Sequence, residues 1–361
     1  MFFMKKIIAT ILSIVVLAVA LWGADFVLKD RTDHGVKQCL AMYEQPKDSI
    51  DVVMLGSSHV HYGVNTAKLW EEYGISAFDF SSAEQPLWIS YYYLKELCKT
   101  QKPKVVVLDF FTPAAFQDEY KYKYTHLADS MNGFKFGVNK LKMMWASFDG
   151  EKENWNKYFP GFFGYHDRYD ALEDEDIEEF KYDYVNFKGF TPYFQMNPVS
   201  APSINPSEVL APSDKSVEYL QEIVDYTKAN GIELYLTIVP YHVNEEQVMD
   251  QIQAEDLRYN WLVQYVAQQN EAGNTHVYYD YTVQHYWDIG IDFESGQDTY
   301  DGSHLNYYGA TKFSHYLGEQ LRNLYGEEVL PDHRGDEYYK SWDVNAEEMR
   351  KVVEENGFEW R

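Results

Sequence analysis

Short apolar runs alternate along much of the chain with longer segments of helical periodicity. The apolar runs lie at 50–55, 76–80, 104–108, 232–239 and 277–279. Strands buried on both faces of a sheet read in this way, because neither face is turned to water. Helical segments follow or separate them, at 69–73, 86–99, 213–230, 245–269 and 307–325. This order predicts a three-layer α/β/α fold with a mostly parallel five-stranded sheet.

The N-terminal segment has a different pattern. Lys5 and Lys6 precede an apolar run from Ile7 to Trp22, and counting on to residue 24 gives about 18 residues, close to the ~20 that cross a bilayer as a helix. The lysines on the N-terminal side predict a cytoplasmic N-terminus with everything after Asp25 outside. Ala18-Val19-Ala20 also fits a signal-peptide cleavage site, which would give a secreted protein. We favour the uncleaved anchor because the apolar run continues past that site.

These patterns divide the chain into four parts. We expect a transmembrane anchor at 1–24, a helical connector at 25–48, a main domain at 49–330 and a C-terminal extension at 331–361. Within the main domain, residues 115–210 are rich in Tyr, Phe, Trp and Asp without a clean period. This stretch is interpreted as an insertion with short helices, placed as a cap beside the active site.

Two distant motifs carry residues suited to acyl transfer. Gly56-Ser57-Ser58 follows the first predicted strand, and Asp301-Gly302-Ser303-His304 precedes the last long helix. Ser58 is the candidate nucleophile, His304 the candidate base and Asp301 the group that orients the imidazole. Each motif also has a simpler explanation, a helix cap for the first and a loop histidine with a local carboxylate for the second. The hypothesis requires the two loops to meet at the carboxyl ends of the strands.

Taken together, the two motifs resemble those of the SGNH (GDSL-like) hydrolase superfamily, over roughly residues 50–325. The likeness is greatest to membrane-anchored SGNH-like proteins of bacterial cell envelopes, including those of alginate acetylation and teichoic acid D-alanylation. The stretches 78–88 and 236–241 fit further parts of that pattern. The resemblance implies an SGNH/flavodoxin-like fold, no cofactor, and a membrane-bound O-acyltransferase as a possible partner.

The chain departs from the family pattern around the oxyanion hole. The family's second block usually supplies a Gly N–H, where this chain has Ser81 and Ser82, so the oxyanion candidates are Ser58, Ser81 and Ser82. Its third block usually supplies an Asn side chain, where this chain has Asp109. An ionised Asp109 would repel an oxyanion. The side chains considered for substrate binding are His59, Gln85, Tyr241 and Asn306.

Charge and cysteine content narrow the functional classes. The net charge is −26, from 57 acidic and 31 basic residues, and such a surface repels nucleic acid and anionic lipid. The two cysteines, Cys39 and Cys98, could pair after export, but the sequence does not decide it. The acidic stretch 288–301 lacks EF-hand spacing, and no metal site is expected.

These observations predict an exported, membrane-anchored serine esterase or O-acyltransferase that acts on a cell-surface polysaccharide or teichoic-type polymer. The alternative is a catalytically weak or inactive scaffold of the same fold. Such a scaffold would bind envelope polymer or recruit a membrane-bound O-acyltransferase.

Overall fold

The predicted strands form one sheet. A computed structural model describes residues 2–29, 31–116, 124–148, 172–243, 247–248, 251–252 and 254–361. Its main strands are β1 (Val52–Leu55), β2 (Ala77–Asp79), β3 (Val105–Asp109), β4 (Glu233–Thr237) and β7 (Val277–Asp280). They pair in the order β2-β1-β3-β4-β7, and all four pairings are parallel. The predicted five-stranded α/β sheet is confirmed, and it is wholly rather than mostly parallel.

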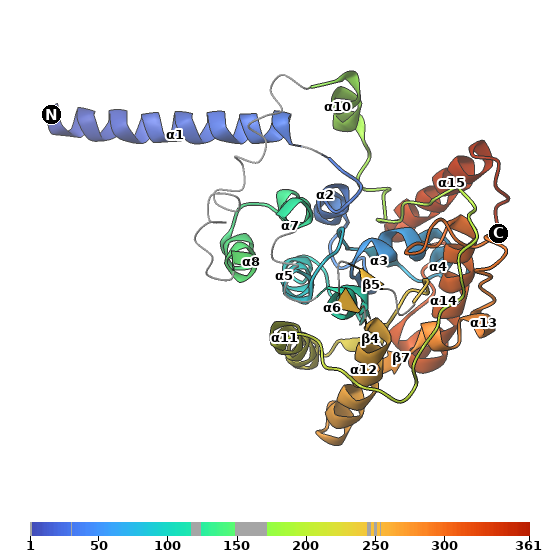
Figure 1. Cartoon of the computed structure of the whole chain (residues 1–361). Coiled ribbons are helices and arrows are strands. Elements are labelled where there is room, and N and C mark those ends of the chain that lie inside the picture. The colour runs from blue at the N-terminus through green and yellow to red at the C-terminus, as the bar shows by residue number, and fades with distance from the viewer. Residues whose placement is uncertain are drawn as a thin grey trace.

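Successive side chains of the strands β1 to β4 enter two different hydrophobic cores. On β3, Val106 and Leu108 belong to one core, and Val105 and Val107 to the other. The first core includes residues of α5 (Leu87–Leu97), α11 (Asp214–Asn230) and α12 (Glu255–Glu271). The second is formed with α3 (Ser58–Gly63), α4 (Thr66–Tyr73) and α14 (Tyr307–Val329). Helices therefore cover both faces of the sheet, and both strand faces are apolar for that reason (Figure 1).

Local signals set several helix ends as the sequence predicts. Ser213 caps α11 by accepting a hydrogen bond from Ser216 N–H, and Gly231 ends the helix in the left-handed conformation. The helix expected from residue 245 begins only at Glu255, because β5 (Gln247–Val248) and β6 (Gln251–Ile252) precede it as a short antiparallel pair. Two short helices follow β7, the 3-10 helix η5 (Thr282–Gln284) and α13 (Tyr286–Ile289).

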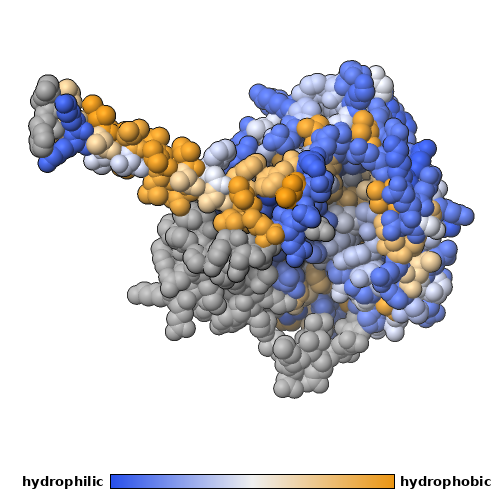
Figure 2. All heavy atoms as spheres, turned by 90° about the horizontal axis from the view of Figure 1, so that it is seen from above, coloured by the Kyte–Doolittle hydropathy of each residue, from blue (hydrophilic) through white to orange (hydrophobic). Residues whose placement is uncertain are grey.

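The N-terminal helix stands away from the body. α1 (Phe2–Leu28) is long and apolar enough to cross a membrane, and its apolar side chains are exposed. Figure 2 shows hydrophobic residues along this projecting helix and on the adjoining surface, beside a largely hydrophilic body. The connector then forms α2 (Val36–Glu44), which packs on the body.

The stretch 115–210 contains short helices and one long extended segment. α6 (Phe111–Ala115) ends where the stretch begins, and the helices in its described part are α7 (Tyr124–Asn132), α8 (Val138–Phe148), α10 (Asp174–Glu178) and η4 (Glu179–Lys181). Residues 117–123 and 149–171 lie outside the described part of the chain. Residues 182–213 have no regular secondary structure. This segment runs along the body in Figure 1 and donates backbone hydrogen bonds to the loops near the strand ends, as from Asn197 to Thr299 and from Ser203 to Val243.

The C-terminal extension packs into the same body. After η6 (Glu337–Tyr339), helix α15 (Lys340–Glu355) lies against α4. Trp342 of α15 is fully buried, its indole N–H donates to Ala77 O at 3.1 Å, and the Lys188 amino group lies 3.8 Å from its ring centroid. Residues after 331 thus contribute to the core that contains β2.

We expect Trp342→Ala to lower the free energy of unfolding by about 3–5 kcal/mol, because it leaves a cavity and an unpaired carbonyl. Urea unfolding of the detergent-solubilised protein, followed by circular dichroism, measures this. Val352→Ala on the exposed part of the same helix is the control and should change stability by less than about 0.5 kcal/mol. Equal effects of the two substitutions would contradict a structural role for the extension.

Candidate active site

The turn after β1 presents Ser58. Gly56 has φ +150°, and a Cβ at this position would lie 2.8 Å from Asp109 Cβ, so the close approach of the two strand ends requires glycine. Ser57 is the N-cap of α3 and accepts a hydrogen bond from His59 N–H. Ser58 is therefore the first residue of the helix, and its N–H has no partner within it.

Asp109 closes this turn from the end of β3. Its Oδ1 accepts from Val239 N–H at 3.0 Å, and its Oδ2 accepts from Phe111 N–H at 3.3 Å and lies 3.4 Å from Ser57 Oγ. The side chain is buried, and burial raises its pKa to about 7 although these donors act in the opposite sense. Asp109 binds the protein's own backbone, which gives it a structural role beneath the serine turn.

His304 sits on a tight loop before α14. Asp301 Oδ1 accepts hydrogen bonds from Ser303 N–H at 2.7 Å and from His304 N–H at 2.8 Å. Tyr300 N–H donates to His304 O at 2.9 Å, and Thr299 pairs with Leu305 in an isolated bridge. The carboxylate thus organises the loop and fixes the backbone of the histidine it accompanies.

The two loops meet, although 246 residues separate them. Ser58 Oγ lies 2.9 Å from His304 Nε2, and His304 Nδ1 lies 3.0 and 3.1 Å from the two oxygens of Asp301. The His304 side chain is 18% exposed, so it is reachable from solvent but largely enclosed. Ser58 follows β1 and Asp109 ends β3, so the group lies where the strand order reverses, the usual ligand position in such sheets.

The electrostatics favour a charged Asp301. Burial alone raises the pKa of Asp301, but the His304 ring and the N–H groups of Ser303 and His304 outweigh it, and the pKa lies below its usual value. An ionised carboxylate on Nδ1 holds the imidazole in the tautomer with its proton on Nδ1. Nε2 is then free to accept the proton of Ser58.

A histidine beside an aspartate is not distinctive in this chain. His285 contacts Asp280 at 2.8 Å, and His333 contacts Asp51 at 2.7 Å. His304 differs because its second ring nitrogen faces a serine hydroxyl at the end of a central strand. The three-member arrangement, rather than the pair, identifies the candidate site.

The oxyanion candidates differ in what their N–H groups already bind. Phe80 N–H donates to Met54 O at 2.9 Å and Ser82 N–H to Gly56 O at 3.3 Å, so Ser82 N–H is already bound by the turn after β1. Ser81 lies between these two residues, beyond the end of β2. Its hydroxyl contacts His61 Nδ1 at 3.0 Å. Ser58 N–H is the best-supported donor of the three.

The four residues considered for substrate binding are all buried, and their contacts are within the protein. Gln85 bonds Ser82 and Ser90, and the Tyr241 hydroxyl lies 2.7 Å from that of Tyr259.

The other two of these residues, Asn306 and His59, are equally enclosed. Asn306 caps α14 by accepting from Tyr308 N–H and Gly309 N–H. The His59 ring stacks on Phe111 with centroids 3.7 Å apart, and burial lowers its pKa. Gln85, Tyr241 and Asn306 thus hydrogen-bond within the protein and the His59 ring packs against aromatic rings, and a part of these residues in substrate binding stays a prediction.

Sequence reasoning missed a wall of aromatic rings beside His304. Tyr193 stacks on Tyr62 with centroids 4.0 Å apart and on Tyr300 with centroids 3.7 Å apart. Tyr62 and Tyr193 both meet the His304 ring at steep angles, with centroids 5.3 and 5.7 Å away. Tyr193 comes from the extended segment and gives no periodic signal in the sequence. The available clue was Tyr62, one helical turn after Ser58.

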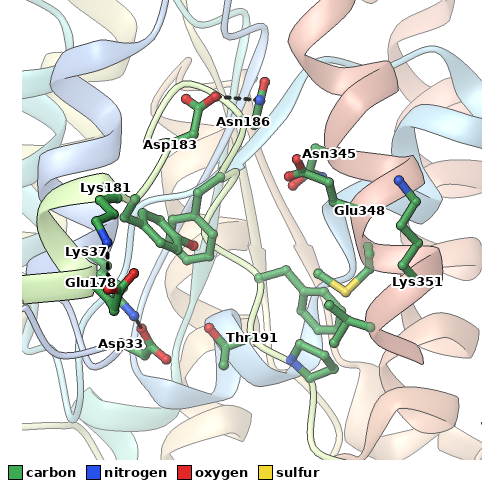
Figure 3. Close-up of a pocket in the computed structure, with 16 residues that line it drawn as sticks. Asp33, Lys37, Glu178, Lys181, Asp183, Asn186, Thr191, Asn345, Glu348 and Lys351 are labelled. Carbon is green, nitrogen blue, oxygen red and sulfur yellow. Dashed lines mark hydrogen bonds and ion pairs between the residues drawn. The ribbon is translucent and has the colours of Figure 1, made fainter. Parts of the chain in front are cut away.

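A cavity of about 730 Å³ lies between the connector, the segment after α10 and α15, apart from the serine site. Most of its charged groups pair with one another (Figure 3): Lys181 contacts Glu178 at 2.6 Å, and Asn186 donates to Asp183 at 2.7 Å. Lys37 pairs with Asp33 and with Glu179, each at 2.8 Å. Among the described lining residues no serine or cysteine stands beside a histidine, so Ser58 remains the candidate nucleophile.

The described residues were also compared with the requirements of a metal site and of a reactive cysteine. Within them, no group of three or more His, Cys, Asp and Glu side chains is arranged to hold a metal ion. Cys39 and Cys98 are both free thiols, and burial raises the pKa of each. Neither thiol has the lowered pKa of a reactive cysteine.

The fold and this site define the chain as a doubly wound α/β protein with a Ser-His-Asp arrangement at its switch point. Comparisons with protein-family models and with curated proteins found no match.

The raised pKa of Asp109 predicts a pH dependence of stability. An unfolded Asp has a pKa near ~3.9, against about 7 in the fold. The folded state therefore holds this proton more tightly than the unfolded chain does. The stabilisation that protonated Asp109 gives the fold is complete below pH ~4 and is lost as the pH rises through about 7. We expect Asp109→Asn, which stays uncharged, to remove up to about 4 kcal/mol of this decline.

Urea unfolding of both proteins across pH 4 to pH 8 measures the difference. Buried groups that remain in both proteins, such as Glu255, cancel in the comparison. Parallel stability curves for the variant and the unmodified protein would show that Asp109 is charged throughout.

Proposed function

We propose that this chain is an SGNH-type serine esterase or O-acyltransferase that acts on acyl esters of a cell-surface polysaccharide or teichoic-type polymer. The observation that carries the proposal is the contact of Ser58 Oγ with His304 Nε2 at 2.9 Å, backed by Asp301 at 3.0 Å from Nδ1. Hydrogen-bond reach between nucleophile and base is the geometric requirement for this chemistry.

In the first half-reaction, Ser58 Oγ attacks the acyl carbonyl while its proton passes to His304 Nε2. The negative charge on the carbonyl oxygen is stabilised by donors such as Ser58 N–H at the start of α3. The tetrahedral intermediate collapses, His304 returns the proton to the departing alcohol, and the acyl group stays on Ser58. Asp301 remains ionised and stabilises the imidazolium.

In the second half-reaction, an acceptor hydroxyl gives its proton to His304 and attacks the acyl-serine. The ester bond to Ser58 breaks, and the serine recovers its proton. Water as the acceptor gives an esterase, and a polymer hydroxyl gives an acyltransferase.

The cellular setting follows from α1. A helix of this length and apolarity supports a single-pass anchor, and Lys5 and Lys6 before it favour a cytoplasmic N-terminus with the body outside. Cleavage near residue 20, with secretion of the body, is the alternative. A membrane-bound O-acyltransferase is the partner that such a protein would work with.

A catalytically weak scaffold that binds polymer or recruits that partner is the second candidate. It is favoured by the oxyanion site, where Asp109 replaces a side-chain donor and binds backbone groups instead. Labelling with a fluorophosphonate separates the two. The enzyme proposal expects covalent labelling of the full-length protein in detergent, at Ser58 by peptide mapping. An unlabelled Ser58, with no turnover of p-nitrophenyl acetate, would favour the scaffold.

A further inference from the structure

The connector that follows the membrane helix reaches the candidate site. His34 Nδ1 lies 3.1 Å from the Tyr62 hydroxyl, and Tyr62 is on α3 one turn after Ser58. Ala83 N–H donates to His34 O at 2.8 Å, which ties the connector to the turn after β2. His34, in the connector after α1, is thus in contact with the helix of the nucleophile.

The neighbouring backbone makes this contact tight. Gly35 has φ +138°, and a Cβ there would come within 2.5 Å of Ser82 Cβ. Gly35 N–H donates to Gln38 Oε1 at 3.0 Å, and Gln38 Nε2 donates to Gly189 O at 3.3 Å. The connector therefore packs against Ser82 without room for adjustment.

Contacts of Arg31 also fix the start of the connector, close to the end of α1. Arg31 donates to Lys29 O at 2.9 Å and to Phe26 O at 2.8 Å, and its guanidinium lies 4.3 Å from the Phe180 ring centroid. The ion pair of Lys37 with Glu179 adds a second attachment to η4, while the pair of Lys37 with Asp33 lies within the connector. Segments on both sides of His34 are thus held by the body.

Stacked aromatic rings connect Tyr62 with His304, the candidate base. Tyr62 stacks on Tyr193, Tyr193 stacks on Tyr300, and Tyr300 directly precedes Asp301. Two of these rings contact the His304 imidazole through their edges or faces. A shift of Tyr62 therefore changes the space in which the imidazole can rotate.

We propose that His34 is a positioning residue of this active site, which makes the connector of the membrane anchor a structural part of the catalytic centre. The proposal rests on the proposed function, because it assigns His34 the task of holding Tyr62 against the base. Displacements of about 1 Å at a base cost rates of the order of 10²-fold. We expect His34→Ala to lower kcat for p-nitrophenyl acetate roughly tenfold while KM changes less than about twofold.

The test uses the full-length protein in detergent and a double-mutant cycle. His34→Ala, Tyr62→Phe and the double variant are compared by kcat and KM. If the hydrogen bond is the link, the double variant loses no more than the worse single variant. His34→Asn, whose Oδ1 stands near the position of Nδ1, should recover most of the lost kcat.

The chain offers a matched control in a second tyrosine–histidine pair. The Tyr73 hydroxyl lies 3.3 Å from His315 Nδ1 on the exposed side of α4 and α14. Tyr73→Phe and His315→Ala should leave kcat within about twofold of the unmodified protein. Multiplicative losses for His34→Ala and Tyr62→Phe, or no loss with His34→Ala, would overturn the proposal.

A second measurement separates this proposal from the proposed function. Nitrogen-15 spectra of labelled histidines report the tautomer and environment of His304 without any substrate, with the signal assigned by comparison with His304→Gln. We expect His34→Ala to move this signal, and His315→Ala to leave it in place. A moved signal in a protein without esterase activity would keep the positioning role and reject the enzyme. An unmoved signal in an active protein would reject the positioning role alone.

Discussion

Replacing Ser58 with alanine is expected to lower kcat/KM for p-nitrophenyl acetate by about 10⁴–10⁶-fold, the range seen when a triad nucleophile is removed. The reason is geometric: Ser58 Oγ is the atom 2.9 Å from His304 Nε2, and its loss leaves the base without a nucleophile. The hydroxyl adds little to the core, so the folded state should persist. Steady-state kinetics and fluorophosphonate labelling measure the effect, and both signals should disappear together.

Ser57→Ala provides the matched control one residue away. Ser57 Oγ caps α3 and contacts Asp109, so its loss should cost about 0.5–2 kcal/mol of stability. It should reduce kcat/KM by less than about tenfold, because it does not contact His304. Activity of Ser58→Ala within tenfold of the unmodified protein would exclude the mechanism proposed for this site.

The sheet could be predicted from the sequence because the strands β1 to β4 are buried on both faces. Runs such as Val105-Val106-Val107-Leu108 have no polar position that would suit a solvent-facing side, and the structure sends alternate side chains into two cores. The order of the strands was not readable, because it depends on where each crossover helix returns. The position of β1 between β2 and β3, which creates the switch point beside Ser58, is a property of the assembled sheet.

The chemical identity of the site residues was readable, but their surroundings were not. Ser58, Asp301 and His304 stand in short motifs whose turn chemistry predicts exposed side chains at element ends. Tyr193 lies in a segment without helix or strand, where no periodicity relates it to His304. Its stacking between Tyr62 and Tyr300 depends on the path of the whole segment over the strand ends.

The sequence also does not show which polar residues near the motifs hydrogen-bond to the backbone. Asn306 beside His304 looked available to a substrate, but the first turn of α14 needs an acceptor for its free N–H groups. Asp109 looked like a failed oxyanion donor, whereas the tight approach at Gly56 brings its carboxylate to the backbone of Val239 and Phe111. In both positions the side chain hydrogen-bonds to the protein's own backbone, an engagement that the sequence motifs do not show.

Asp301→Asn is expected to lower kcat by about 10³–10⁴-fold without disrupting the loop. The reason is that the two carboxylate oxygens of Asp301 have different hydrogen-bond partners. Oδ1 accepts the N–H groups of Ser303 and His304 at 2.7 and 2.8 Å, so the amide oxygen of asparagine should take that position. The amide NH₂ then replaces Oδ2, which lies 3.1 Å from His304 Nδ1. The oxygen left at the Oδ1 position is 3.0 Å from Nδ1 but already accepts the two backbone N–H groups, so the new contact at Nδ1 is with the NH₂. A donor at Nδ1 favours the tautomer with its proton on Nε2, and that nitrogen can no longer accept the proton of Ser58.

Asp292→Asn is the control, because Asp292 Oδ1 also accepts a backbone N–H, from Ser295 at 3.0 Å, in a nearby loop, and its pKa is likewise lowered, chiefly by that donor. Its kcat should stay within about twofold of the unmodified protein. Steady-state kinetics of both variants, with the histidine tautomer read from nitrogen-15 spectra, give the comparison. The expected tautomer change with undiminished kcat would mean that proton transfer to His304 Nε2 is not part of turnover. An unchanged tautomer with a 10³-fold loss would instead assign Asp301 a role through the imidazolium charge alone.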